Sequence, residues 1–156
     1  YSLAYSHISC NVISWGCSSM CDRVLASQKR ILRLIFNLKP MESCRTTFMT
    51  KKILTFFGIY IYKCAAFVIK NKPLFKILGS TGHYNVRNNN TLLVPKHKTS
   101  MYKDSPTYNC IKIYNKLPKE LKSLHNQKCL NKLKTFLCRK AFYSLDEFMR
   151  CSENIW

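Results

Sequence analysis

A run of apolar residues in the middle of the chain most constrains what this protein can fold into. Positions 56–69 hold 14 residues, of which only Lys63 is charged. A helix that spans a bilayer needs about 20 apolar residues, so the run is too short to be a membrane anchor. A helix that is apolar on every side has to be buried. The run therefore predicts a core helix over residues 56–70, which residues 71–73 would end.

The rest of the chain indicates further helices around a single core. Its 156 residues suffice for one domain, and its content of 47% apolar and 13% aromatic residues is too high for a disordered chain. Apolar residues recur at helical spacing, and cap signals stand at Ser105-Pro106 and in the capping box over 144–147. We expect a mainly α fold, a small helical domain of about six helices with one long basic loop and at most a short strand pair. The expected elements lie near residues 5–15, 20–38, 46–54, 56–70, 106–117, 118–124 and 130–141, and from 144 onward.

The segment 20–38 is predicted to be an amphipathic helix. A proline follows at position 40, and the residue before a proline resists helical geometry, so the helix should end there. Its apolar side is expected to hold Val24, Ile31, Ile35 and Leu38. Its other side carries the cations Arg23, Lys29, Arg30 and Arg33.

Residues 79–104 differ from the rest of the chain. They are rich in Gly, Asn, Ser, Thr and Lys, and only 92–94 could form a brief strand. A loop of this length inside a compact domain is uncommon and is usually functional or disordered. We divide the chain into a helical segment 1–78, a basic loop 79–104 and a C-terminal helical segment 105–156. The two helical segments are expected to form one structural unit.

The charge balance points to a polyanionic partner. The chain has 26 basic and 7 acidic residues, a net charge of +19, and the span 43–103 holds no acidic residue. Self-repulsion of this size works against a compact state unless a polyanion neutralises it. Lysines outnumber arginines by 19 to 7, which favours contact with phosphates over the reading of base edges. A membrane-surface role is less favoured, because the basic residues surround the helices and form no single polar face.

The cysteines and glycines give no cofactor signature. Nine cysteines at irregular spacing favour free thiols in a reducing compartment over a disulfide framework. The best zinc grouping would be His7, Cys10, Cys17 and Cys21. Its spacing is loose and lacks a C-x-x-C knuckle, so these side chains are expected to pack, and we predict no metal. The four glycines form no phosphate-binding loop, and we predict no cofactor.

The acidic residues also argue against an active site. Two-metal polymerase or nuclease chemistry needs at least a pair of convergent carboxylates. The adjacent pair Asp146-Glu147 is explained by a helix cap and the helix dipole. No Cys–His pair carries a family signature. We therefore expect no catalytic residues and no enzyme activity from the chain as it stands.

Short motifs along nearly the whole chain resemble the C-terminal region of reverse transcriptases from non-LTR retrotransposons, in the jockey-like group of insects and other animals. No single motif is diagnostic, and the resemblance rests on their order and spacing. The motifs are SH (6–7), SWG (14–16), QKRILRLI (28–35), KP (39–40), SCR (43–45), KILT (52–55), YIY (60–62), YNVRN (84–88), LVPKHK (93–98), SPTY (105–108), IKIYNKLP (111–118) and FYSLDEF (142–148).

The resemblance implies a nucleic-acid-handling segment without the catalytic centre. Intact members resemble two-part enzymes, with an apurinic-endonuclease-like domain followed by a right-hand polymerase. This chain matches only the stretch after the palm, and it has no counterpart of the catalytic Asp-Asp box. The expected function is that of a C-terminal, thumb and post-thumb fragment of an RNA-directed DNA polymerase. Its expected partners are RNA, DNA and, if it is present upstream, the rest of the polymerase polypeptide. The expected location is the cytoplasm and the nucleus.

An alternative interpretation stays open. Phe56-Phe57 stands where members often have Leu-Pro, and Val86 stands where Thr is common. Such departures also suit a non-functional transposon remnant, or a basic interaction module without an enzymatic role.

We predict that nucleic acid touches two surfaces, the basic side of helix 20–38 and the long loop. Three cations within about one and a half helical turns suit a phosphate backbone. In the loop, cations stand near a tyrosine that could stack on an unpaired base. A solvated helix face and a packing tyrosine are the simpler alternatives. The predicted contact residues are Lys29, Arg30 and Arg33 on the helix and Tyr84, Asn85, Arg87, Lys96, His97 and Lys98 in the loop.

Overall fold

The computed structural model describes residues 1–39, 41–77, 91–96, 98–99, 102 and 105–151. These residues form helices joined by short connections, and no strand longer than a single bridge is found among them, so the predicted mainly α fold is confirmed. The helices are α1 (Ser2–Ser9), α2 (Val12–Trp15), α3 (Cys21–Phe36), α4 (Cys44–Thr50), α5 (Phe56–Lys70), the 3-10 helix η1 (Lys72–Leu74), α7 (Pro106–Lys116), α8 (Lys119–Lys122), α9 (Asn126–Lys140) and α10 (Leu145–Arg150).

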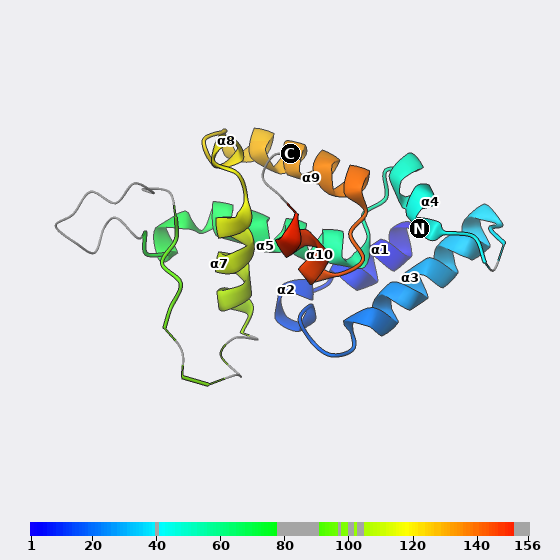
Figure 1. Ribbon diagram of the computed structural model, residues 1–156, viewed down its shortest axis with the longest axis horizontal. Helices are drawn as coiled ribbons and strands as arrows, with labels where there is room; N and C mark the ends of the chain where they lie inside the picture. The colour runs from blue at the N-terminus through cyan, green and yellow to red at the C-terminus, as the bar shows by residue number, and fades with distance from the viewer. Residues whose placement is uncertain (40, 78–90, 97, 100–101, 103–104, 152–156) are drawn as a thin grey trace.

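Helix α5 is the centre of the molecule. It packs against α7 and α9 from the C-terminal segment and against α1, α2 and α3 from the N-terminal segment (Figure 1). Its N-cap Thr55 is completely buried, accepts a hydrogen bond from the Gly58 amide at 3.1 Å and donates one to the Phe142 carbonyl at 2.7 Å. The predicted core helix is therefore confirmed, and one hydroxyl joins its first turn to a residue 87 positions away.

The first predicted helix is broken in two. The segment 5–15 was expected to be continuous, but Asn11 adopts a left-handed conformation with φ 46° between α1 and α2. The break turns α2 so that Trp15 stacks on Phe56, with 5.5 Å between the ring centroids. Gly16 follows at a point where the backbone lies against the ring of Tyr60, and a Cβ at this position would overlap that ring.

Helix α3 buries a face that overlaps only in part with the one predicted. Cys21, Leu25, Gln28 and Leu32 are buried, whereas Ile35 is 48% exposed. The prediction was right in part, since Val24 and Leu38 pack against the core, but it did not include Gln28. The Gln28 side chain donates to the Leu54 carbonyl at 2.9 Å and accepts from the Phe56 amide at 2.8 Å. Since its polar atoms are satisfied, this amide is buried at little cost.

Three helices end in residues with left-handed backbone. Asn37 (φ 50°), Lys52 (φ 51°) and Ala141 (φ 47°) follow α3, α4 and α9. At the end of α4, the Lys52 amide donates to the Met49 carbonyl and the Ile53 amide to the Phe48 carbonyl. This pair of hydrogen bonds is the Schellman motif, which fixes the direction in which the chain leaves the helix.

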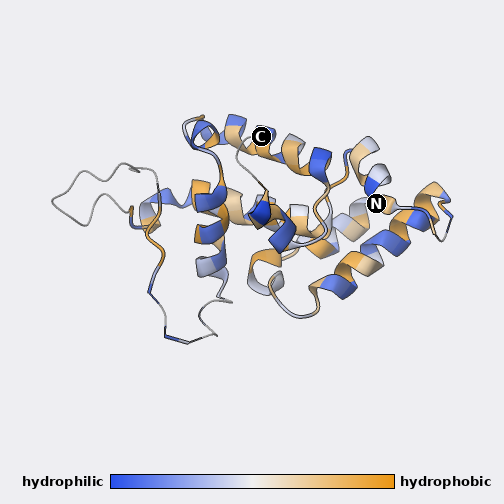
Figure 2. Cartoon of the chain, viewed as in Figure 1, coloured by the Kyte–Doolittle hydropathy of each residue, from blue (hydrophilic) through white to orange (hydrophobic). Residues whose placement is uncertain are grey.

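The C-terminal helices cover α5 with their apolar sides. Ser105 caps α7 and Ser144 caps α10, each accepting a hydrogen bond from the amide three residues on, as the sequence predicts. Helix α9 turns apolar residues toward α5 and hydrophilic ones outward (Figure 2). The predicted brief strand is a single antiparallel bridge between Ile77 and Leu92.

No helix in the part of the chain that the structure describes is long and apolar enough to cross a membrane.

Candidate nucleic-acid interface

The three cations predicted on the second helix lie on α3 but differ in their surroundings. Arg30 is exposed to solvent. The Lys29 ammonium lies 3.8 Å from the centroid of the Tyr143 ring. Arg33 donates to the Glu42 carbonyl at 3.3 Å, and its Nε is buried without a hydrogen-bond partner. Arg30 is therefore the one of the three whose whole head group is open to a ligand.

Helix α4 adds a further cation to this region. The Arg45 guanidinium lies 4.5 Å from the centroid of the Tyr143 ring. It binds the Glu147 carboxylate with both terminal nitrogens, at 3.0 and 3.1 Å. Glu147 in turn accepts from the Tyr143 amide at 2.8 Å. We call Lys29, Arg33, Arg45, Tyr143 and Glu147 the Tyr143 cluster.

The Tyr143 cluster keeps an excess of positive charge. It holds three cations against one carboxylate. Burial raises the pKa of the Tyr143 phenol, and Cys44 raises it further, whereas Arg45 and Arg33 lower it. The phenol oxygen is buried without a hydrogen bond of good geometry, so the neighbouring cations are its main polar surroundings. The cluster joins α3 and α4 to the turn before α10 and fixes the positions of their cations.

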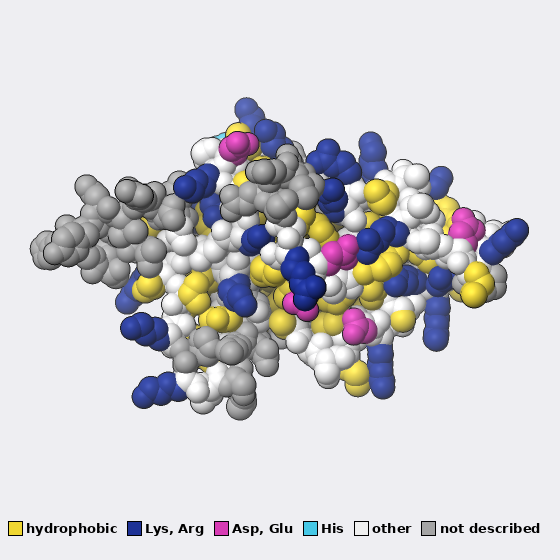
Figure 3. Space-filling model, viewed as in Figure 1, with side chains coloured by type: hydrophobic (Ala, Val, Ile, Leu, Met, Phe, Trp, Pro, Cys, Tyr) yellow, Lys and Arg dark blue, Asp and Glu magenta, His cyan; other side chains and the backbone are white. Residues whose placement is uncertain are grey.

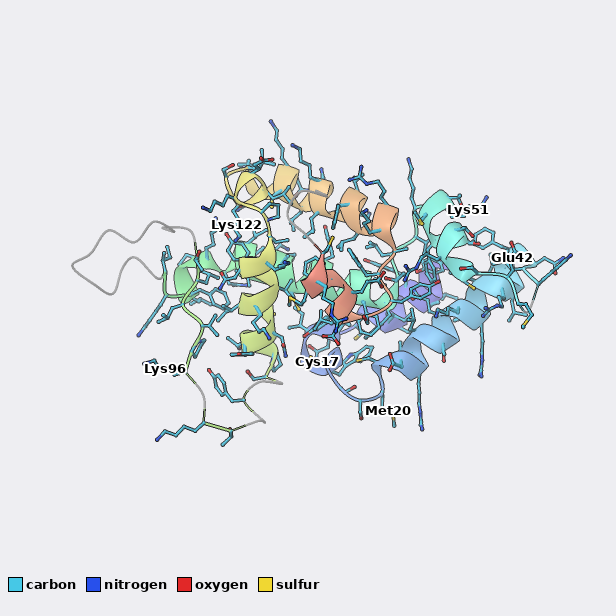
Figure 4. The ribbon with its side chains drawn as sticks, viewed as in Figure 1. Cys17, Met20, Glu42, Lys51, Lys96 and Lys122 are labelled. Atoms are coloured by element: carbon cyan, nitrogen blue, oxygen red, sulfur yellow. The ribbon has the colours of Figure 1, made fainter. Side chains whose placement is uncertain are left out.

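The loop residues fall into two groups. Lys96 and Lys98 are exposed. Tyr84, Asn85, Arg87 and His97 lie outside the residues that the structure describes. Lys96 and Glu42, which borders the end of α3, lie at opposite ends of the long axis (Figure 4). The described loop lysine Lys96 and the end of α3 therefore do not converge on one site.

Most of the cations that the structure describes form no ion pair with a described carboxylate. Of the 26 basic residues, all but Arg87 and Lys103 lie in the described part, which leaves 24; of the 7 acidic residues, all but Asp104 and Glu153 do, which leaves 5. Between described residues one ion pair forms, Arg45–Glu147. Lysine and arginine side chains project around most of the outline in Figure 3, where acidic side chains are few.

Sequence reasoning missed Arg45 and Tyr143. The capping box was the available signal, because its acidic residue, Glu147, accepts from the Tyr143 amide, one residue before the N-cap, and still has a negative charge to share with a cation. The cation that pairs with Glu147 is Arg45, which lies 102 positions away in the sequence and comes close only when α4 packs near α10. Local patterns do not encode that contact.

Of the residues considered for zinc, His7 and Cys10 are exposed and Cys17 is half-buried, so the expectation that all four pack was wrong for His7 and Cys10. Cys21 is buried, and its thiol donates to the Gly16 carbonyl at 3.1 Å. Asp22 and Asp146 border one hollow of about 270 Å³, each in the first turn of a helix. Among the residues described, no three His, Cys, Asp or Glu side chains gather as a metal site would need.

Comparison of the chain with protein families, with curated proteins and with solved structures found no match.

Proposed function

We propose that this protein binds the phosphate backbone of RNA and DNA with little sequence preference and without catalysis. It would do so as the C-terminal, thumb and post-thumb segment of a non-LTR retrotransposon RNA-directed DNA polymerase. The polymerase assignment is supported by the ordered motifs in the sequence. The binding assignment is supported by the surface, where 24 described cations face 5 acidic residues and form one ion pair with them.

The kind of cation supports backbone binding over base recognition. Arginine reads guanine with both arms of its guanidinium, whereas lysine acts as a point charge on phosphates. Arg45 already uses both arms on Glu147, and Arg33 is partly buried beside Glu42. The remaining cations are mostly lysines. Helix α9, for example, exposes Lys128, Lys132 and Lys134.

The absence of catalysis is part of the proposal. Phosphoryl transfer by two metals needs carboxylates that converge on the metals. Asp22 and Asp146 each stand in the first turn of a helix, where a negative charge stabilises the helix dipole. Glu147 is occupied by Arg45 and a backbone amide. We expect no primer extension and no nuclease activity with Mg²⁺ or Mn²⁺; activity that survives rigorous purification would contradict this part.

Salt dependence is the direct test of binding. On single strands each neutralised phosphate contributes about −0.7 to the slope of log affinity against log salt, and about −0.9 on duplex DNA. With about five contacts, affinity for a single strand should fall about a hundredfold between 50 and 200 mM salt. Fluorescence anisotropy with RNA and DNA oligonucleotides of several unrelated sequences measures this. An affinity that does not change with salt would refute the proposal.

Charge reversal tests the two predicted surfaces. Because Arg33 is partly buried, the helix is better probed by Arg23→Glu with Arg30→Glu, two exposed cations seven residues apart on α3. The loop is probed by Lys96→Glu with Lys98→Glu. Each pair should weaken binding and flatten the salt slope while the circular dichroism spectrum stays that of the parent. If both pairs bind like the parent, the contacts lie elsewhere on the surface.

A further inference from the structure

A hollow of about 500 Å³ lies between the end of α4 and the last turns of α9. It belongs to neither of the surfaces predicted from the sequence. Helices α4 and α9 pack against each other, and the end of α9 lies beside α4 in Figure 1. The hollow is lined by Met49, Lys52, Lys134, Thr135, Cys138 and Arg139. We call it the α4–α9 groove.

The cations of the α4–α9 groove come from both of its walls. Lys52 is contributed by the end of α4, and Lys134 and Arg139 by α9. All three are exposed, and none of the described residues that line the groove is acidic. The only ion pair between described residues is at Glu147 and involves none of these cations. The groove therefore holds three positive charges that no carboxylate of the described chain neutralises within ion-pair distance.

The backbone fixes the position of Lys52 opposite α9. The Schellman motif at the end of α4 holds Lys52 in the left-handed region, at φ 51°. The Cys138 thiol donates to the Lys52 carbonyl at 3.3 Å, which ties this residue to α9. Burial raises the pKa of Cys138, and the ammonium groups of Lys134 and Lys52 lower it. Both ammonium groups therefore lie close enough to Cys138, at the floor of the hollow, to affect its thiol electrostatically.

The floor of the groove is apolar. Cys138 is 7% exposed, and Met49 is 40% exposed at the rim. Among the described residues, no aromatic side chain lines the groove, so these residues offer no stacking platform for a particular base. The adjoining hollow between α8 and α9 shares Thr135 and Arg139 with it but is also lined by Glu120, whose charge opposes an anion there. Of the two, the α4–α9 groove is the better anion site.

We propose that the α4–α9 groove binds a phosphate of single-stranded RNA or DNA, with the attached sugar and base resting on its apolar floor. A duplex presents its phosphates on a convex rod, whereas a flexible strand can place a phosphate inside a hollow. Lysine and arginine on two walls would hold the phosphate, and methionine adapts its shape to whichever base follows. This inference rests on the proposed function and names the site that the two predicted surfaces do not include.

The first test removes the three charges. Lys52→Gln, Lys134→Gln and Arg139→Gln together should lower affinity for a 12-nucleotide RNA at least about tenfold at 50 mM salt and reduce the steepness of the salt slope by about 2. The matched control is Lys70→Gln, Lys72→Gln and Lys76→Gln, which removes three exposed cations at the end of α5 and just after it. It should lower affinity less than about threefold. Equal losses in the two triple variants would overturn the groove assignment but leave the proposed function standing.

A second test keeps every cation. Thr135→Glu places a carboxylate between the three charges and should weaken RNA binding at least about tenfold. Thr107→Glu, at an exposed position of α7, is the control and should bind like the parent. Lys52→Arg with Lys134→Arg should also bind like the parent, because the charge is kept. A Thr135→Glu variant with parental affinity would refute the groove.

Repeating the binding measurements with a duplex tests whether the groove prefers single strands. The groove variants should change affinity for a 12-base-pair duplex less than affinity for the single strand. A larger effect on the duplex would overturn the single-strand assignment. If the parent chain binds neither RNA nor DNA, the proposed function fails and the groove assignment fails with it.

Discussion

At the scale of single residues, two backbone positions carry more constraint than their side chains suggest. Gly16 has an ordinary helical φ of −68°, so it is not there for conformational freedom. It is required because the ring of Tyr60, itself completely buried, lies where a Cβ would be. Lys52 differs from Gly16, because its left-handed backbone is a conformation that favours glycine, yet it carries a long side chain. That side chain lines the α4–α9 groove.

Gly16→Ala should destabilise the protein by about 2 kcal/mol or more, because the new methyl group has to displace Tyr60 or the α2 backbone in a packed core. Gly58→Ala is the control. Its Cβ would lie 3.2 Å from Thr55 Oγ1 and 3.3 Å from Leu54 Cδ2, a tight contact offset by the better helix propensity of alanine. That variant should stay within about 1 kcal/mol of the parent. Urea unfolding measures both, and equal stabilities would contradict the overlap at Gly16.

Lys52→Gly should make the protein more stable than Lys52→Ala by about 1 kcal/mol. Both variants lose the charge. Only glycine also removes the cost of about 1–2 kcal/mol that a Cβ carries in left-handed backbone. Part of that gain is offset, because glycine loses more backbone entropy on folding than alanine does. Asn37→Gly should gain less relative to the parent than Lys52→Gly does, since asparagine tolerates this conformation better than lysine. The comparison uses chemical unfolding at fixed salt. A Lys52→Ala variant as stable as Lys52→Gly would show that the end of α4 is not strained.

At the scale of elements, α3 and α5 are joined by one buried amide. Gln28 is completely buried and bonds to the Tyr1 hydroxyl, the Leu54 carbonyl and the Phe56 amide. The Phe56 amide is one of the first donors of α5, which have no partner within their own helix. The side chain therefore fixes the angle at which α5 starts relative to α3.

Gln28→Leu should cost about 2–4 kcal/mol, although leucine is similar in size and apolar. It leaves the Phe56 amide buried without a partner, and it leaves the Leu54 carbonyl with only the Tyr1 hydroxyl at 3.3 Å. A buried polar group that loses its partner costs about 1–3 kcal/mol. Ser27→Ala, an exposed change on the same helix, should be close to neutral. Thermal unfolding followed by circular dichroism measures the difference. Stability equal to the parent would mean that water or another group replaces the amide.

At the scale of the whole molecule, apolar pattern and cap chemistry were readable from the sequence, and long-range polar contacts were not. The core helix over 56–70 and the caps at Ser105 and Ser144 follow from local rules, and the structure confirms them. The buried face of α3 was misread in part because Gln28 finds its partners 26 and 28 positions away. The Tyr143 cluster and the α4–α9 groove were missed for the same reason, since α4 meets α9 and α10 only in the folded chain.

The net charge of +19 should make stability depend on ionic strength. Self-repulsion opposes the compact state, and salt screens it over about 8 Å at 0.15 M. The midpoint of thermal unfolding should therefore rise between 20 and about 200 mM sodium chloride, as differential scanning calorimetry would show. One main core includes residues of both helical segments, so a single cooperative transition is expected. Separate transitions, or a midpoint that falls with salt, would contradict this.

The central position of α5 also sets a timing problem for the growing chain. Lys70 ends α5, and the last residue of α9, Lys140, is added 70 residues later. At about 5–20 residues per second, the most apolar helix of the protein waits several seconds on the ribosome before its cover is made. Uncovered apolar surface of this kind is what chaperones bind and what drives aggregation. A product that stops between α5 and the end of α9 should therefore be insoluble, because it lacks helices that pack on α5.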